Sequence, residues 1–143
     1  MSDELAARVA DALHAQAGAA KAWGITIEEV REGYARVSMV VREDMLNGHE
    51  VCHGGMIFSL ADTAFAYACN SRNIHTMAQQ ASVVFVAPAR LGERLIAEAQ
   101  EQARAKRSGV YQVRVTKAGG EDVAAFQGLS RSVGGEILSH DQF

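Results

Sequence analysis

The chain has 143 residues, 48% of them hydrophobic and only one of them proline, which is the size and apolar content of one globular domain with its own core. We therefore expect a single domain over residues 1–143. The formal net charge of −3 gives no basic field that would attract a nucleic acid backbone or an anionic membrane surface. We expect neither of these as a partner.

Two cysteines, Cys52 and Cys69, are too few for a disulfide framework. The N-terminal segment also lacks the basic start and the continuous apolar stretch of a secretory signal. Both observations favour a cytoplasmic protein. Three histidines lie in polar stretches, where we expect them to be solvated: His14, His75 and His140.

Residues 3–22 place apolar side chains at four-residue spacing, which predicts an amphipathic surface helix: Leu5, Val9 and Leu13. A period-two pattern then runs over residues 25–41 and is interrupted by Glu32-Gly33, which predicts a hairpin of two strands. Residues 42–53 have no periodicity and contain the turn dipeptide Asn47-Gly48, so we expect a loop there.

The segment 54–70 is apolar almost all the way round a helical wheel, so it predicts a helix that protein buries on nearly all sides. It is too short and too interrupted to cross a bilayer, which takes about 20 apolar residues. Four strand-like runs follow, over residues 77–86, 94–105, 109–117 and 122–131, and the tail after Val133 looks polar and frayed.

This order of elements predicts an α+β fold, in which a sheet of about six strands curls around one central apolar helix and an extra helix precedes them. A sheet that curls in this way still has two edges with unpaired backbone groups. Pairing with a second copy of the chain would cover such an edge.

Asp62 is the one ionisable group within the apolar helix, and no cation lies three or four positions away on either side. An unpaired buried carboxylate costs several kcal/mol, so another group must compensate the charge or the site must be wet, as a ligand pocket is. The carboxylate is therefore a candidate catalytic group. The alternative is a structural acid that accepts hydrogen bonds from the backbone of a neighbouring loop.

Two other features precede this acid. His53-Gly54-Gly55 opens the helix, so unpaired N–H groups of its first turn suit the oxygen of a carbonyl that becomes an oxyanion; alternatively, the glycines only permit a tight entry turn. Asn47 has an amide that could orient a water or an acyl group, although Asn-Gly is above all a turn signal.

Helix geometry restricts how these groups act together. Gly54 and Asp62 are eight residues apart, or about 12 Å along a helix, whereas a base or a nucleophile must come within about 3 Å of its target. If both groups serve one carbonyl, the carboxylate comes from a second subunit. Two antiparallel helices across a two-fold axis would create two equivalent sites.

The stretch N-G-H-x-x-C-H-G-G-x-x-F-S-L-A-D-T-A-F-A-Y-A-C-N, residues 47–70, closely resembles the PaaI-type acyl-CoA thioesterases of the hot-dog superfamily. The resemblance covers about residues 20–135, which we expect to form the domain core. It implies the hot-dog fold, with an antiparallel sheet of roughly six strands around the central helix. It also implies a homo-oligomer, in which a dimer is required and a tetramer is expected.

By position, the resemblance implies that Asp62 is the base or nucleophile, Gly54 the oxyanion donor, Asn47 an orienter of water or acyl group, and His53 a positioning residue near the carbonyl. Some related enzymes have a threonine one turn after the acid, where this chain has Ala66. That hydroxyl is therefore missing here, or its role falls to another residue, for which Thr63 and Ser59 are the candidates.

The activity implied is hydrolysis of an acyl-CoA, of a phenylacetyl or hydroxyphenylacetyl type, with CoA as part of the substrate and no separate cofactor. A thiol has a pKa near 8.5, so it leaves as thiolate without a general acid, and one carboxylate with one oxyanion hole suffices. Further candidates for substrate contact are Gly55, Thr63, Phe58 and, for the CoA phosphates, Lys106 and Arg107.

The same residues admit four other interpretations. Cys52 beside His53 could be a nucleophile, but neighbouring side chains on an extended loop point in opposite directions. The cluster of His49, Cys52, His53 and Asp62 does not match the spacing of a metal site, so we expect no metal. The remaining alternatives on the same fold are a non-catalytic acyl-CoA-binding module and a dehydratase or hydratase, which would use His53 with Asp62 to shuttle protons.

Overall fold

The computed structural model describes residues 2–139. Within these residues, three α-helices, one short 3₁₀ helix and six strands follow one another in the order α1 Ser2–Gln16, α2 Gly18–Ala22, β1 Thr26–Arg31, β2 Tyr34–Val40, η1 Glu43–Met45, α3 Gly54–Cys69, β3 Thr76–Phe85, β4 Arg94–Ala105, β5 Ser108–Lys117 and β6 Asp122–Ser132. The six strands predicted from the sequence are confirmed to within two residues at either end.

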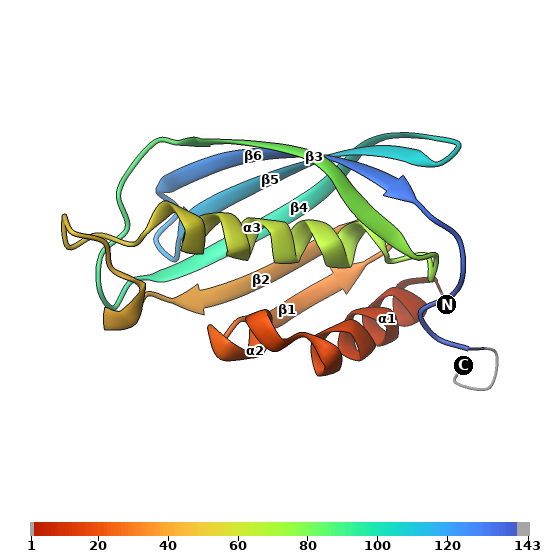
Figure 1. Ribbon diagram of the computed structural model, residues 1–143, viewed down its shortest axis with the longest axis horizontal. Coiled ribbons are helices and arrows are strands. Elements are labelled where there is room, and N and C mark those ends of the chain that lie inside the picture. Colours follow the sequence, from red (N-terminus) through yellow and green to blue (C-terminus); the bar gives the residue numbers. More distant parts are fainter. Residues whose placement is uncertain (1, 140–143) are drawn as a thin grey trace.

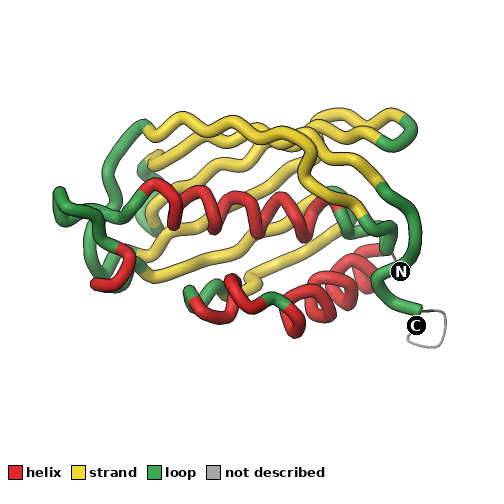
Figure 2. The backbone as a smooth tube through the Cα atoms, viewed as in Figure 1, coloured by secondary structure: helices red, strands yellow, loops and turns green. Residues whose placement is uncertain are grey.

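The six strands form one antiparallel sheet in the order β1-β2-β4-β5-β6-β3, so β1 and β3 are its edges. The sheet curls, and α3 lies in its hollow, where it contacts all six strands (Figure 1). The backbone drawn by secondary structure shows the same two layers, with α3 in front of the strands (Figure 2). The predicted sheet around a central helix is therefore confirmed.

Aromatic packing explains how α3 is seated so closely on the sheet. The Phe65 ring is 1% exposed and lies 5.8 Å from the ring of Phe126 and 5.5 Å from that of Tyr111. It occupies the space over Gly128 of β6, where an added Cβ would stand 2.7 Å from the ring. A glycine within a strand commonly marks such a close approach. Any larger residue at position 128 would push the helix off the sheet.

The N-terminal region differs from the single helix expected, because α1 ends at Gln16 and α2 begins at Gly18. Of the predicted stripe, Val9 is buried, while the smaller Ala6 and Ala10 complete the contact with the body of the protein. The helix α1 packs along β1, so it covers that edge of the sheet (Figure 1). This layer closes the β1 side of the molecule.

Two expectations about polar residues were wrong. His14 is only partly exposed, and its Nδ1 lies 2.7 Å from the hydroxyl of the buried Tyr67, a contact that ties α1 to α3. Residues 134–139, the described part of the tail, are held in place, because Asn73 accepts from the backbone N–H of Leu138 at 2.8 Å and donates to its carbonyl at 3.0 Å. Neither contact could be recognised from the polar sequence around these residues. His140 lies outside the described residues.

The β3 side remains open in the single chain. Large apolar side chains along and just after β3 are half or more exposed: Met77 62%, Val84 63%, Phe85 50% and Val86 58%. One stripe of α3 is also only partly covered, and it contains Ser59, Asp62 and Ala66 at helical spacing. The expectation that protein buries α3 on nearly all sides holds for most of the helix, and this stripe is the part that one chain leaves only partly covered.

Candidate active site

The N-terminus of α3 presents one backbone donor without a partner. His53 is the N-cap, with φ −59° and ψ 135°, and its Nδ1 accepts a hydrogen bond from the Gly55 N–H at 2.8 Å. An accepting Nδ1 is unprotonated, which places the ring proton of the neutral imidazole on Nε2. The Gly54 N–H makes no hydrogen bond within residues 2–139. It is therefore available to an external acceptor.

Close packing accounts for both glycines at this turn, since neither has a positive φ. A Cβ at Gly54 would stand 3.0 Å from Cζ of Phe85, and a Cβ at Gly55 would stand 3.0 Å from Nδ1 of His53. Gly55 thus makes room for the histidine cap, and Gly54 makes room for an aromatic ring from the end of β3. Close packing against these two rings, rather than the conformation of a tight entry turn, therefore explains why both residues are glycine.

Asp62 lies on the partly open stripe of α3. Its carboxylate has no hydrogen bond or ion pair with any residue of the described chain. Burial raises the pKa of this carboxyl above its usual value of 3.8, with no cation nearby to offset the desolvation. The structural alternative, an acid held by backbone donors of a loop, therefore finds no support in the contacts within the chain.

The neighbouring hydroxyls on α3 are already engaged as donors. Ser59 Oγ donates to the Gly55 carbonyl at 2.9 Å, and Thr63 Oγ1 donates to the Ser59 carbonyl at 2.7 Å. Such bonds leave only lone pairs for a ligand. Neither side chain thus offers a free proton in place of the hydroxyl that is missing at Ala66.

Asn47 organises the loop before the helix. Its Oδ1 accepts from the backbone N–H groups of His49 at 2.9 Å and of Val51 at 3.3 Å. The turn interpretation therefore accounts for the side-chain oxygen of Asn47. The side-chain Nδ2 makes no hydrogen bond in the described chain. The amide is left with donor capacity only, which restricts any contact with a substrate to an acceptor atom.

An apolar groove begins at the helix N-terminus and was not anticipated from the sequence. It runs between the loop before α3 and the end of β3, and its lining residues are Val51, Cys52, Gly54, Ile57, Phe85, Val86, Ala87 and Pro88. The missed signal is the run Val84-Phe85-Val86, which breaks the alternation of a half-buried strand. Phe58, by contrast, packs inward on Phe126 with ring centroids 5.4 Å apart.

The structure does not bring Lys106 and Arg107 to this groove. Both lie in the turn between β4 and β5, beside the end of α3 and the loop that follows it. The helix has 16 residues, so it separates them from Gly54 by about 24 Å. If they contact the same substrate as Gly54, they contact a distant part of it.

The structure bears on two of the alternative interpretations, the cysteine nucleophile and the metal site. Cys52 is 4% exposed, and burial raises its thiol pKa to about 11, so it is neutral near pH 7 and unsuited to nucleophilic attack. In the described part of the chain, histidine, cysteine and acidic residues form no group of three that could hold a metal ion. No helix there is long and apolar enough to cross a membrane.

Comparison with known proteins identifies the family. The sequence family described as the thioesterase superfamily matches residues 49–124, which include both Gly54 and Asp62. The acyl-coenzyme A thioesterase PaaI of Escherichia coli K12 is 44% identical over 128 residues, which is 90% of this chain and 91% of that protein. The chain belongs to the thioesterase superfamily.

Solved structures agree with this assignment. The E. coli PaaI protein from the phenylacetic acid degradation operon superimposes with a TM-score of 0.94 at 42% identity, over 95% of this chain and 99% of that one. A mutant of the phenylacetic acid degradation protein PaaI from Thermus thermophilus gives 0.79 at 32% identity, over 82% and 100%. The predicted PaaI-type thioesterase with a hot-dog fold is therefore confirmed.

Proposed function

We propose that this thioesterase hydrolyses acyl-CoA esters at a site that two subunits share. The observation that supports it most is the pair of unsatisfied groups on α3, the Gly54 N–H and the Asp62 carboxylate, which lie about 12 Å apart along one helix. They cannot meet one carbonyl within one chain. Two antiparallel copies of α3 would bring each acid to the other's glycine.

The chemistry needs few groups. Asp62 of one subunit attacks the thioester carbon, or removes a proton from a water that attacks it, and the carbonyl electrons move onto oxygen. The Gly54 N–H of the other subunit donates to that oxyanion. When the carbonyl re-forms, the C–S bond breaks and the sulfur leaves as thiolate. With water as the attacking group this step gives the free acid, whereas direct attack leaves a mixed anhydride on Asp62 that a water then hydrolyses to the free acid and the carboxylate. His53 positions the glycine turn, and the Asn47 amide donates to a water or to the acyl oxygen.

The partner on the open side is a second copy of the chain. The exposed apolar residues of β3 and the partly open stripe of α3 occur on the same side, and the stripe has small residues such as Ser59 and Ala66, which let two helices approach closely. Pairing of β3 with its symmetry mate would satisfy the backbone groups of that edge. Assembly of such dimers into a tetramer stays a prediction.

The acyl group we propose is aromatic and of the phenylacetyl type. The groove beside Gly54 is lined almost entirely by apolar side chains, with the Phe85 ring against the glycine itself. Aromatic rings favour offset or edge contacts with one another. The two PaaI relatives belong, by name, to phenylacetic acid degradation. CoA enters as part of the substrate, with no separate cofactor.

The test is release of free thiol from a panel of acyl-CoA esters, measured with a thiol reagent on purified protein. We expect turnover of phenylacetyl-CoA to exceed that of acetyl-CoA. Asp62→Asn should keep the fold and the oligomer and lower kcat at least about a hundredfold, the usual scale for loss of a base. Turnover near the wild-type value in Asp62→Asn would overturn the mechanism.

The same assay separates the alternatives. A non-catalytic module would bind acyl-CoA and release no thiol from any ester in the panel. A dehydratase or hydratase would change the absorbance of an enoyl-CoA without release of thiol. Either result would replace the proposed function.

A further inference from the structure

Ser59 lies at the centre of the side of α3 that one chain leaves partly open. Successive residues of a helix are about 100° apart, so Thr63 lies about 40° to one side of Ser59 and Asp62 about 60° to the other. These three residues are only partly buried. Leu60 and Ala64, which point away from this side, are fully buried. A second copy that covers the open side therefore approaches Ser59 most directly.

The shared site fixes how two copies of α3 are aligned. If Asp62 is level with Gly54 of the partner subunit, the two-fold axis crosses each helix midway between these positions, at the level of Phe58. Phe58 itself packs inward on Phe126. Ser59 is therefore the residue of the open side nearest to the axis. It is one residue from that level, so the two copies of Ser59 are offset by about 3 Å along the helix direction.

The edge strand β3 gives an independent estimate of this level. It runs antiparallel to α3, because the Asn70 side chain at the end of the helix bonds the backbone of Thr76 at 2.9 and 3.0 Å. At the other end of the strand, the Phe85 ring lies against Gly54. The axis lies about 6 Å along the helix from Gly54, or about two strand residues, so it is level with about Val83.

The regular part of β3 has its centre at the same point. A bulge between Ala78 and Gln80 interrupts the strand, which ends at Phe85. The uninterrupted stretch of residues 80–85 is therefore centred next to Val83. A two-fold axis through that centre lets the whole stretch pair with its counterpart on the partner subunit. The helix and the strand thus indicate one common position for the axis.

Helix packing then limits the size of residue 59. Packed helices have axes about 8–10 Å apart, and Cα atoms lie about 2.3 Å from each axis. With the 3 Å offset, the two Ser59 Cα atoms are therefore about 4.5–6 Å apart. The Ser59 hydroxyl is folded back on its own helix, where it donates to the Gly55 carbonyl at 2.9 Å. Such a short separation leaves room for a small side chain only.

We propose that Ser59 is a positioning residue, which meets Ser59 of the partner subunit beside the two-fold axis and sets the separation of the two helices. This inference rests on the proposed shared site. The small size of the residue, rather than its hydroxyl, lets each Asp62 reach the Gly54 N–H of the partner subunit. A larger side chain at position 59 moves both acids away from both oxyanion donors at once.

The first experiment measures the contact by disulfide formation between copies. A disulfide needs Cα atoms about 4.4–6.8 Å apart, so Ser59→Cys should give a covalent dimer on oxidation with diamide, and dithiothreitol should reverse it. Ala66→Cys is the matched control on the same side of α3. It lies eight residues from the axis, so its two copies are about 24 Å apart and should stay unlinked on a denaturing gel.

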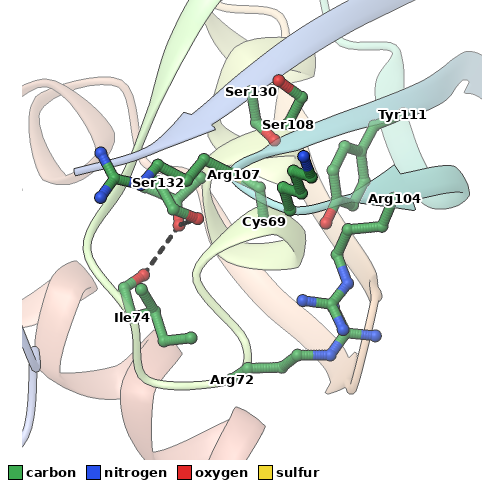
Figure 3. Close-up of a pocket in the computed structure, with 11 residues that line it drawn as sticks. Cys69, Arg72, Ile74, Arg104, Arg107, Ser108, Tyr111, Ser130 and Ser132 are labelled. Carbon is green, nitrogen blue, oxygen red and sulfur yellow. Dashed lines mark hydrogen bonds between the residues drawn. The ribbon is translucent and has the colours of Figure 1, made fainter. Parts of the chain in front are cut away.

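The native cysteines provide the blank for this experiment. Cys52 is buried, and burial raises its thiol pKa to about 11. Cys69 lies beside Tyr111 at the C-terminal end of α3 (Figure 3), and burial raises its thiol pKa to about 12. Its two copies would be about 33 Å apart across the axis. Wild-type protein should therefore give no covalent dimer under the same conditions.

The second experiment varies the size of residue 59. A displacement of about 1 Å in an active site can cost about a hundredfold in rate, so we expect Ser59→Leu to lower kcat about a hundredfold. KM for phenylacetyl-CoA should change much less, and light scattering should show that the oligomer persists through β3. If Ser59→Leu separates into monomers, the smaller step Ser59→Val decides the same question.

Two controls accompany this series. Ser59→Ala keeps the small size and loses only the hydroxyl, so it should retain most of the turnover. Ala15→Leu adds the same side chain at an exposed position of α1 and should leave kcat unchanged. Equal losses in Ser59→Ala and Ser59→Leu, or wild-type kcat in the dimeric variant with the larger side chain, would remove the positioning role.

The cross-link also separates this inference from the proposed function. Heterodimers of Asp62→Asn with a chain that lacks the Gly54 N–H test the shared site by their turnover. Active heterodimers, together with a Ser59→Cys protein that stays unlinked or an Ala66→Cys protein that links equally well, would retain the shared site and overturn the contact at Ser59. Inactive heterodimers of a protein that links through Ser59→Cys would overturn the shared site, and with it the positioning role.

Discussion

The two edges of the sheet are finished differently. At the β1 edge, α1 covers the strand and polar groups are paired within the chain: Glu28 with Arg94 at 2.6 Å, and His14 with Tyr67 at 2.7 Å. At the β3 edge, Val84 and its apolar neighbours are exposed and Phe85 lies against Gly54 of α3, whose partly open stripe contains the unpartnered carboxylate of Asp62.

This difference shows where function resides. A single chain satisfies its own polar groups wherever the fold alone requires it, and none of the fully buried side-chain polar atoms in residues 2–139 lacks a partner. The groups left unsatisfied occur together with the exposed apolar strand. We therefore place both the second copy of the chain and the substrate on this surface, where a single chain leaves polar groups unpaired and apolar side chains exposed.

The largest expected effect concerns the backbone donor at the open side. Gly54→Pro removes the N–H itself, and the extended conformation of His53, φ −59° and ψ 135°, is one that a following proline accepts. We expect kcat to fall about 10²–10³-fold, the cost of losing one oxyanion donor.

Gly54→Ala is the matched control, because it meets the Phe85 ring in the same way but keeps the N–H. Single-turnover measurements on both variants check the prediction. Equal losses in the two variants would mean that crowding against Phe85, rather than the missing donor, lowers the rate.

The next effect tests the comparison between the edges. Val84→Glu places a charge on the exposed β3 edge, where it leaves the core intact, and we expect dissociation to monomers with at least about a tenfold loss of turnover. Thr26→Glu places the same charge on an exposed position of β1 and should change neither property. Light scattering and thiol release measure both. A fully active monomer of Val84→Glu would show that the β3 edge is irrelevant to catalysis.

A smaller effect concerns the helix cap. His53→Ala removes the acceptor for the Gly55 N–H and should lower the free energy of unfolding by about 1 kcal/mol, with a parallel loss of turnover. His53→Asn supplies a good N-cap and should restore both, as denaturant unfolding and kinetics would show. If Asn restored stability but not turnover, the imidazole would act on the substrate directly.

The smallest effect is a pH dependence. Burial raises the pKa of Asp62 in the folded protein above 3.8, so the folded state favours its protonated form and the stability contributed by this group falls as pH rises through its folded pKa. Asp62→Asn should therefore be more stable near pH 7, by up to about 1 kcal/mol, and lose this advantage below its usual pKa.

Thermal unfolding at several pH values measures that difference. Asp11→Asn, at an exposed position of α1, changes the same charge and serves as control. An Asp62→Asn variant less stable than wild type at pH 7 would indicate a structural role for the carboxylate.

Sequence patterns predicted the strands well because each alternates toward one core, and the apolar helix could only lie within the sheet. They did not predict the contacts that depend on tertiary partners. Leu138 appears in a polar tail, yet Asn73 of a distant loop secures it. The run around Phe85 breaks the strand alternation, but nothing local in the sequence indicates that its ring lies against Gly54. Such contacts join segments whose proximity no local period encodes.

Among the candidate site residues, Asp62 and Gly54 could be selected from the sequence because each breaks a local rule, a lone acid in an apolar helix and a glycine at a helix start. Asn47 was a weaker candidate, because Asn-Gly is above all a turn signal, and the role of His53 came only from the resemblance. Their hydrogen bonds within the loop and the cap became visible with the fold.

Activity in mixed subunits tests the shared site most directly. Asp62→Asn and Gly54→Pro chains should each be nearly inactive alone. Unfolding and refolding them together in equal amounts gives half heterodimers, each with one complete site of two, so we predict about a quarter of wild-type turnover. A mixture no more active than its separate components would contradict a site built from two chains.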